Sequence, residues 1–84
     1  MKHAGSDALD AIEPLLASIR NVPGLVEKRR GVFYRGSKAF LHFHEDPSGT
    51  HADVRLDGDD FTRMRVATDD ERATLLAMIS GAGR

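Results

Sequence analysis

The chain has 84 residues, of which 40% are hydrophobic and 30% charged, and its formal net charge is -1. A chain of this length builds one modest core, so we expect a single domain over residues 1–84 without a large enzyme cleft. The near-zero net charge predicts no overall attraction to nucleic acid or anionic lipid, and the absence of cysteine excludes disulfides, thiolate catalysis and sulfur-ligated zinc.

The hydropathy pattern predicts a soluble, cytoplasmic protein. No apolar run approaches the ~20 residues of a membrane span, and Met1–Asp10 lacks the apolar stretch of a signal peptide. We therefore expect no membrane partner.

The first predicted element is a helix over Asp7–Arg20. Its apolar residues recur at the spacing of one helical face, at Leu9, Ile12, Leu15, Leu16 and Ile19. Pro14 interrupts this pattern, because a proline inside a helix removes a hydrogen bond and clashes one turn back. We expect the regular helix to begin near Asp10 after a frayed or kinked segment, and to end at the Asn-Val-Pro-Gly run, Asn21–Gly24.

Four strands separated by short turns follow, at Val26–Arg35, Lys38–His44, His51–Asp57 and Phe61–Ala67. Short connections favour an antiparallel meander, in which opposed residues share a face. Across the first turn the register pairs Tyr34 with Ala39, Val32 with Leu41 and Phe33 with Phe40. Across the second it pairs Leu41 with Val54, His42 with Asp53, Phe43 with Ala52 and His44 with His51. Across the third it pairs Leu56 with Thr62, Val54 with Met64 and Asp53 with Arg65.

A second helix follows the strands. Thr68–Glu71 reads Thr-Asp-Asp-Glu, a capping box in which threonine and glutamate satisfy each other's backbone amides. Leu75, Leu76 and Ile79 form its apolar stripe, and the glycine-containing run Ser80–Arg84 is expected to end it. The predicted fold is a two-layer α+β domain: a four-stranded antiparallel meander with a helix at each end of the chain (αββββα), both helices on one sheet face.

The predicted register leaves a basic and aromatic surface on the other sheet face. We call it the binding face; its members are Arg29, Phe33, Arg35, Lys38, Phe40, Arg55, Phe61, Arg63 and Arg65. Exposed rings among cations favour a small binding or self-associating domain, and our first expectation is a homodimer that buries the rings. Single-stranded nucleic acid is an alternative partner, because bases stack on rings and phosphates attract cations.

A second alternative is a metal site, and a catalytic role there, at His42, His44, His51 and Asp53. His42 and His44 are two apart on one strand and point the same way, and the register places His51 and Asp53 beside them. Neutral imidazoles and a carboxylate suit zinc or another borderline divalent cation. Arg65 is an equally good partner for Asp53, so a solvated or dimer face without a cofactor is favoured. No nucleophile elbow or phosphate-binding loop is present, which favours a protein that is not an enzyme.

Two stretches resemble known families. Pro23–Leu56 has a proline-glycine start, a strand, a charged turn and a second strand, and resembles YjbR-like proteins. That resemblance implies a sheet with helices and a role in nucleic-acid binding. Ala39–Leu56, AFLHFHEDPSGTHADVRL, resembles the so-called luciferase domain, where a histidine-rich strand precedes a glycine loop and another strand. The tryptophan common late in these families is absent, so the resemblance implies a fold more than an activity.

Overall fold

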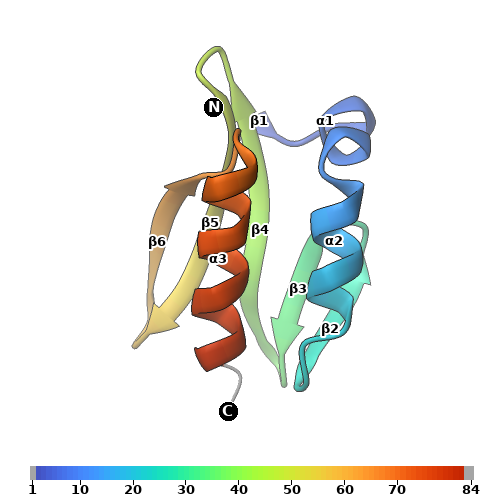
Figure 1. Cartoon of the computed structure of the whole chain (residues 1–84). Helices are drawn as coiled ribbons and strands as arrows, with labels where there is room; N and C mark the ends of the chain where they lie inside the picture. The colour runs from blue at the N-terminus through green and yellow to red at the C-terminus, as the bar shows by residue number, and fades with distance from the viewer. Residues whose placement is uncertain (1, 83–84) are drawn as a thin grey trace.

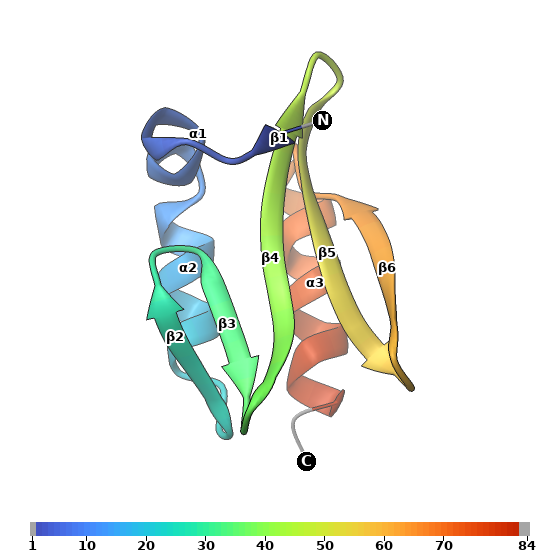
Figure 2. The ribbon, with the colours of Figure 1, turned by 180° about the vertical axis from the view of Figure 1, so that it is seen from behind.

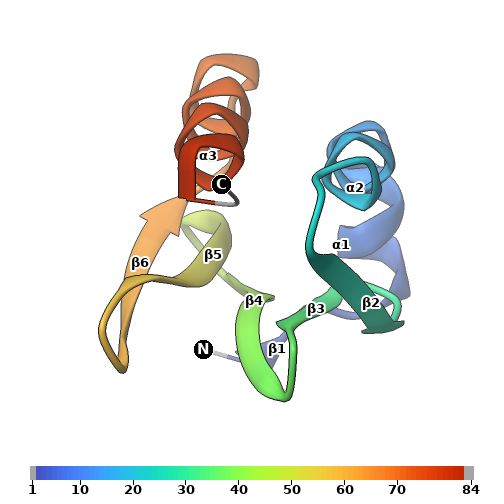
Figure 3. The same ribbon diagram turned by 90° about the horizontal axis from the view of Figure 1, so that it is seen from below.

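The helices lie on one face of an antiparallel sheet in the computed structural model (Figures 1 and 3). The structure describes residues 2–82 apart from the side chains of Asp57 and Ala82. The elements in chain order are β1 (Lys2–His3), α1 (Ser6–Ala11), α2 (Glu13–Arg20), β2 (Leu25–Arg29), β3 (Val32–Arg35), β4 (Lys38–Asp46), β5 (Gly49–Asp57), β6 (Asp60–Arg65) and α3 (Asp69–Ala82). The predicted α+β class and antiparallel sheet are confirmed. The αββββα layout is too simple, because the described residues form six strands and three helices.

The sheet has the order β2-β3-β4-β5-β6, and β1 adds to β4 outside this path. β3 pairs with the first half of β4, at Lys38, Ala39 and Leu41. β1 pairs farther along β4, at His44 and Glu45. The chain therefore brings its N-terminal segment to the middle strand of the sheet, on the edge that β3 leaves free, as the view from behind shows (Figure 2).

Pro14 divides the predicted first helix into α1 and α2, which meet at Ile12. The proline lies in the first turn of α2, where the missing N–H would have no helical partner in any case. The predicted interruption is present, but the predicted start near Asp10 is wrong: the chain is already helical from Ser6, and the break falls at Ile12.

The predicted strand Val26–Arg35 is two strands, β2 and β3, joined at Arg30 and Gly31. Gly31 has φ 81°, a left-handed conformation that suits glycine and reverses the chain. Glu27 stabilises the turn, because its carboxylate accepts a hydrogen bond from the Gly31 backbone N–H at 2.9 Å.

The predicted strand registers agree with the structure to different degrees. All four predicted pairs between β4 and β5 are confirmed. Between β5 and β6, Asp53 lies opposite Arg63 and Val54 opposite Thr62, so the prediction is wrong by two residues. A shift of two keeps every side chain on its face. Between β3 and β4 the Tyr34–Ala39 pair is confirmed, but an irregularity then places Phe33 opposite Leu41.

The hydrophobic core lies between the sheet and the helices. Its largest fully buried side chains are Phe33, Ile12, Leu16, Ile19, Leu41, Leu75, Ile79, Val54 and Val66. The capping box at α3 is confirmed: Thr68 Oγ1 accepts from the Glu71 backbone N–H at 3.1 Å, and Glu71 accepts from the Thr68 N–H at 3.0 Å. The last residue of α3, Ala82, lies within the run Ser80–Arg84 that the sequence predicts to end the helix. No helix among residues 2–82 has the length and apolar character needed to cross a membrane.

Candidate metal centre

Three histidines from two segments meet beside β4. His42 and His44 alternate with the buried Leu41 and Phe43 on that strand, so both point away from the core face. His3 on β1 lies opposite His44. We call His3, His42 and His44 the histidine cluster; one potential ligand atom from each lies within 4.8 Å of the other two.

The N-terminal segment is held against β4 by two hydrogen bonds. The Ala4 backbone N–H donates to the Phe43 carbonyl at 3.1 Å. The Gly5 N–H donates to the carboxylate of Glu45 at 2.7 Å. Together with the β1 ladder, these bonds fix the backbone of His3 while its side chain remains exposed.

The imidazole rings of the cluster are in close contact. The Nε2 atom of His44 lies 2.9 Å from Nδ1 of His42. The ring centroids of His3 and His44 are 4.7 Å apart, and those of His3 and His42 are 5.9 Å apart. Phe61 on β6 covers His42 edge-on at a centroid distance of 5.0 Å.

Asp53 supplies the negative charge beside the cluster. Its side chain is buried, and its Oδ2 atom lies 3.0 Å from Nε2 of His44. Arg63 donates to both carboxylate oxygens, from Nε at 2.7 Å and from Nη2 at 2.8 Å. The hydrogen bonds from Arg63 hold the pKa of Asp53 below its usual range, against the opposing effect of burial. Nε2 of His44 therefore lies between the Asp53 carboxylate, which only accepts hydrogen bonds when ionised, and Nδ1 of His42.

Burial lowers the pKa of His42 below the usual histidine value. The neighbouring His44 and His3 act in the same direction, whereas Asp53 opposes them. The ring is therefore held in the neutral form, which is the form that binds metal ions.

The structure brings together three of the four metal ligands that the sequence predicts. His42, His44 and Asp53 are adjacent, but His51 is turned to other partners: its Nδ1 atom lies 3.2 Å from the Gly49 carbonyl oxygen and 3.9 Å from Asp46. The expected competitor Arg65 lies opposite His51 and donates to Glu71 at 3.2 Å. Arg63 takes the position beside Asp53.

Sequence reasoning missed His3. A strand of two residues has no measurable alternation of apolar and polar side chains, so nothing local indicates that Lys2–His3 joins the sheet. The signal in the sequence was the histidine pair on β4. Two imidazoles do not complete the coordination of a metal ion, so a further histidine from elsewhere in the chain could be expected beside them.

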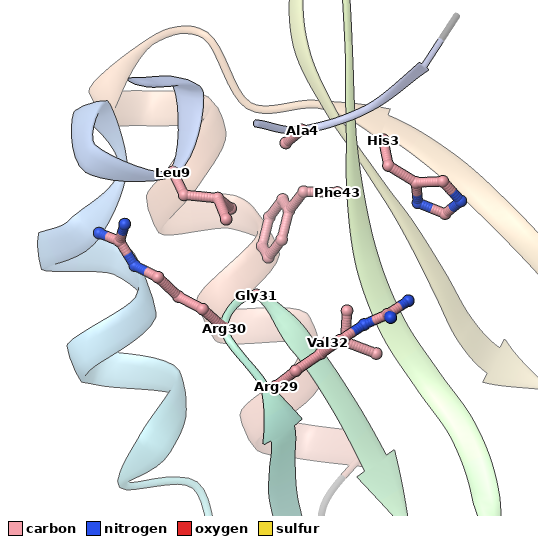
Figure 4. A pocket seen from close by; sticks show the side chains of 8 residues that line it. All are labelled: His3, Ala4, Leu9, Arg29, Arg30, Gly31, Val32 and Phe43. Carbon is pink, nitrogen blue, oxygen red and sulfur yellow. The ribbon is translucent and has the colours of Figure 1, made fainter. Parts of the chain in front are cut away.

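A cavity of about 340 Å³ opens beside the cluster, between the N-terminal segment and the turn from β2 to β3. Its lining residues are His3, Ala4, Leu9, Arg29, Arg30, Gly31, Val32 and Phe43. Figure 4 shows Leu9 and Phe43 pointing toward each other, while the two arginines point to opposite sides. Arg30 is held by Asp10 and Glu13 at 2.7 and 2.8 Å. His3 therefore borders open space on one side and the cluster on the other.

The predicted binding face does not expose its three rings. Phe33 is 1% exposed and belongs to the core, and Phe40 is 3% exposed, so both predictions of exposure are wrong. Only Phe61 among them is exposed, at 38%. Two of the three rings that a homodimer or a nucleic acid was predicted to contact are therefore not available at the surface.

Comparisons of the chain with protein-family models, curated proteins and solved structures found no match. The resemblance to YjbR-like proteins and to the so-called luciferase domain therefore stays a prediction. Any functional assignment depends on the geometry of the chain itself.

Proposed function

We propose that this protein binds a borderline divalent cation such as zinc through His3, His42 and His44, with Asp53 beside them. The observation that carries the proposal is the convergence of three imidazoles from two separate segments, with potential ligand atoms within 4.8 Å of one another. Phe61 contacts only His42 among the three rings, at a centroid distance of 5.0 Å, so an aromatic contact does not account for the convergence of His3 and His44.

The spacing of the polar atoms is close to that of a zinc site. Zinc–nitrogen bonds of about 2.0–2.1 Å place neighbouring ligand atoms of a tetrahedral ion about 3.3 Å apart. Nε2 of His44 lies 2.9 Å from Nδ1 of His42 and 3.0 Å from Oδ2 of Asp53. Small rotations of these side chains would admit an ion, which would displace any proton on the nitrogens that bind it. The exposed His3 ring can turn to complete the set.

The type of ligand atom also determines which class of metal ion the site would bind. Imidazole nitrogen suits zinc, copper, nickel and cobalt, whereas magnesium and calcium prefer oxygen ligands. Because both oxygens of Asp53 accept hydrogen bonds from Arg63, the three histidines alone would bind the ion and leave one position of a tetrahedral ion for water or a ligand, as in catalytic zinc sites. Of the three histidines only His3 lines the neighbouring cavity, so a small molecule there would reach the ion past the His3 ring.

Isothermal titration of the metal-free protein with zinc and with magnesium tests the proposal. We expect one zinc ion per chain and no uptake of magnesium. His42→Ala and His44→Ala should each weaken zinc binding at least about tenfold. Mutation of residues that only hydrogen-bond to a metal ligand already lowers metal affinity on this scale. His51→Ala is the matched control and should bind as the wild type does.

Circular dichroism melts of the metal-free variants separate loss of a ligand from loss of the fold. The proposal fails if the folded wild type takes up no zinc. It also fails if folded His42→Ala and His44→Ala bind zinc as well as His51→Ala does.

A further inference from the structure

A second cavity, of about 240 Å³, lies at the end of the sheet where β3 turns into β4 and β5 turns into β6. These two turns share the lower end of the sheet in Figure 2. The residues that line the cavity are Arg35, Lys38, Ala39, Phe40, Arg55, Leu56 and Gly58. Three of them are cationic, and none of these seven is acidic.

The two arginines of this cavity are held against aromatic rings. The guanidinium of Arg35 lies over Phe40 at 4.3 Å from the ring centroid. The guanidinium of Arg55 lies over Phe61 at 4.5 Å. A guanidinium stacked on a ring uses its face for that contact and keeps its N–H groups, which lie in the plane, for an acceptor.

Each arginine has a buried nitrogen without an acceptor among the described residues. The atoms are Nη2 of Arg35 and Nε of Arg55. A buried, charged donor without a hydrogen bond is costly, and such groups in folded proteins usually have a partner. Both arginines line one cavity, so a ligand bound there would supply an acceptor once the guanidinium groups turn toward it.

Lys38 adds positive charge at the rim. Its ammonium lies 3.5 Å from Asp59, but both side chains are largely exposed, so this pair is weak. The cavity thus offers two arginines without ion pairs among the described residues, and one lysine that can turn inward.

From these observations we propose that this cavity is a binding site for a small phosphate monoester. The phosphate carries close to two negative charges at neutral pH and three oxygens that accept from guanidinium groups. The volume is below the ~300 Å³ of a pocket for drug-sized ligands, which restricts the organic part to a small group. The site lies outside the histidine cluster and does not depend on metal binding.

The test is isothermal titration of the metal-free protein with inorganic phosphate and with phenyl phosphate. We expect both compounds to bind. Arg35→Lys and Arg55→Lys should each weaken binding about tenfold, because lysine keeps the positive charge but lacks the paired N–H donors of the planar guanidinium. Arg29→Lys is the matched control, an exposed arginine outside this cavity. It should bind as the wild type does.

Thermal melts check that each variant folds. The exchange of arginine for lysine preserves the net charge, so a loss of binding would not reflect a change in net charge. The proposal is overturned if neither probe binds at millimolar concentration, or if Arg55→Lys and Arg29→Lys behave alike. Binding of inorganic phosphate with exclusion of phenyl phosphate would overturn the monoester assignment. Far tighter binding of a short oligothymidylate would assign the cavity to nucleic acid instead, if its affinity falls with salt as steeply as several phosphate contacts require.

Discussion

Phe33 lies opposite Leu41 across strands β3 and β4, although the next residue, Tyr34, lies opposite Ala39. One residue of β4, Phe40, is therefore extra in the pairing, as in a β-bulge. Phe33, Phe40 and Leu41 are all buried. This irregularity moves an aromatic ring from the sheet face that regular alternation predicts into the core.

The burial of Phe33 predicts its contribution to stability. Phe33→Ala should lower the free energy of unfolding by about 3–5 kcal/mol, as expected for loss of a buried ring. Phe61→Ala is the matched control, because Phe61 is 38% exposed and its contact with Arg55 contributes about 1 kcal/mol. Urea titrations followed by circular dichroism measure both. Equal losses would contradict the assignment of Phe33 to the core.

A second prediction concerns acid stability and Glu27. Arg20 donates to Glu27 at 2.6 and 3.2 Å, and these hydrogen bonds hold the pKa of Glu27 below its usual value of 4.5. A carboxyl with a lowered folded pKa stabilises the fold above its unfolded pKa, and the contribution is lost as pH falls through the folded value. Glu27→Gln should therefore destabilise the protein at neutral pH and have less effect well below pH 4.5. Denaturation of both proteins across this range measures the difference; a constant difference would exclude the ionic role.

A third prediction concerns the buried carboxylate beside the histidine cluster. In metal-free protein, Asp53→Asn should cost about 1.5–3 kcal/mol, because it removes the charged hydrogen bonds from Arg63. Asp10→Asn is a control with an ion pair of similar length, 2.7 Å to Arg30, at a side chain that is 66% exposed. Its cost should be much smaller, since exposed pairs contribute little. The reverse order in chemical denaturation would contradict a structural role for Asp53.

The elements that the sequence predicts correctly are those with strong local patterns. The β4–β5 register follows from a long alternation around one loop, and the cap of α3 follows from Thr68 and Glu71 alone. Pro14 likewise predicts the break between α1 and α2. In each case one physical preference dominates and no distant contact opposes it.

The predictions from sequence fail where a distant contact or a single residue determines the local structure. Gly31 turns the chain within a run that otherwise has strand character, and the irregularity at Phe40 leaves no mark on the local pattern. For the candidate metal centre, two of the three histidines follow from spacing on β4. His3 does not, because its place depends on the pairing of two residues with a strand forty residues away.

The most direct test of the metal proposal is the zinc affinity of His3→Ala relative to Lys2→Ala. Both changes lie on β1, and Lys2 is an exposed residue outside the cluster, so loss of the strand itself would affect both variants. The account predicts that His3→Ala weakens zinc binding at least about tenfold, while Lys2→Ala binds as the wild type does. Zinc binding in His3→Ala equal to that in Lys2→Ala, with both proteins folded, would contradict it.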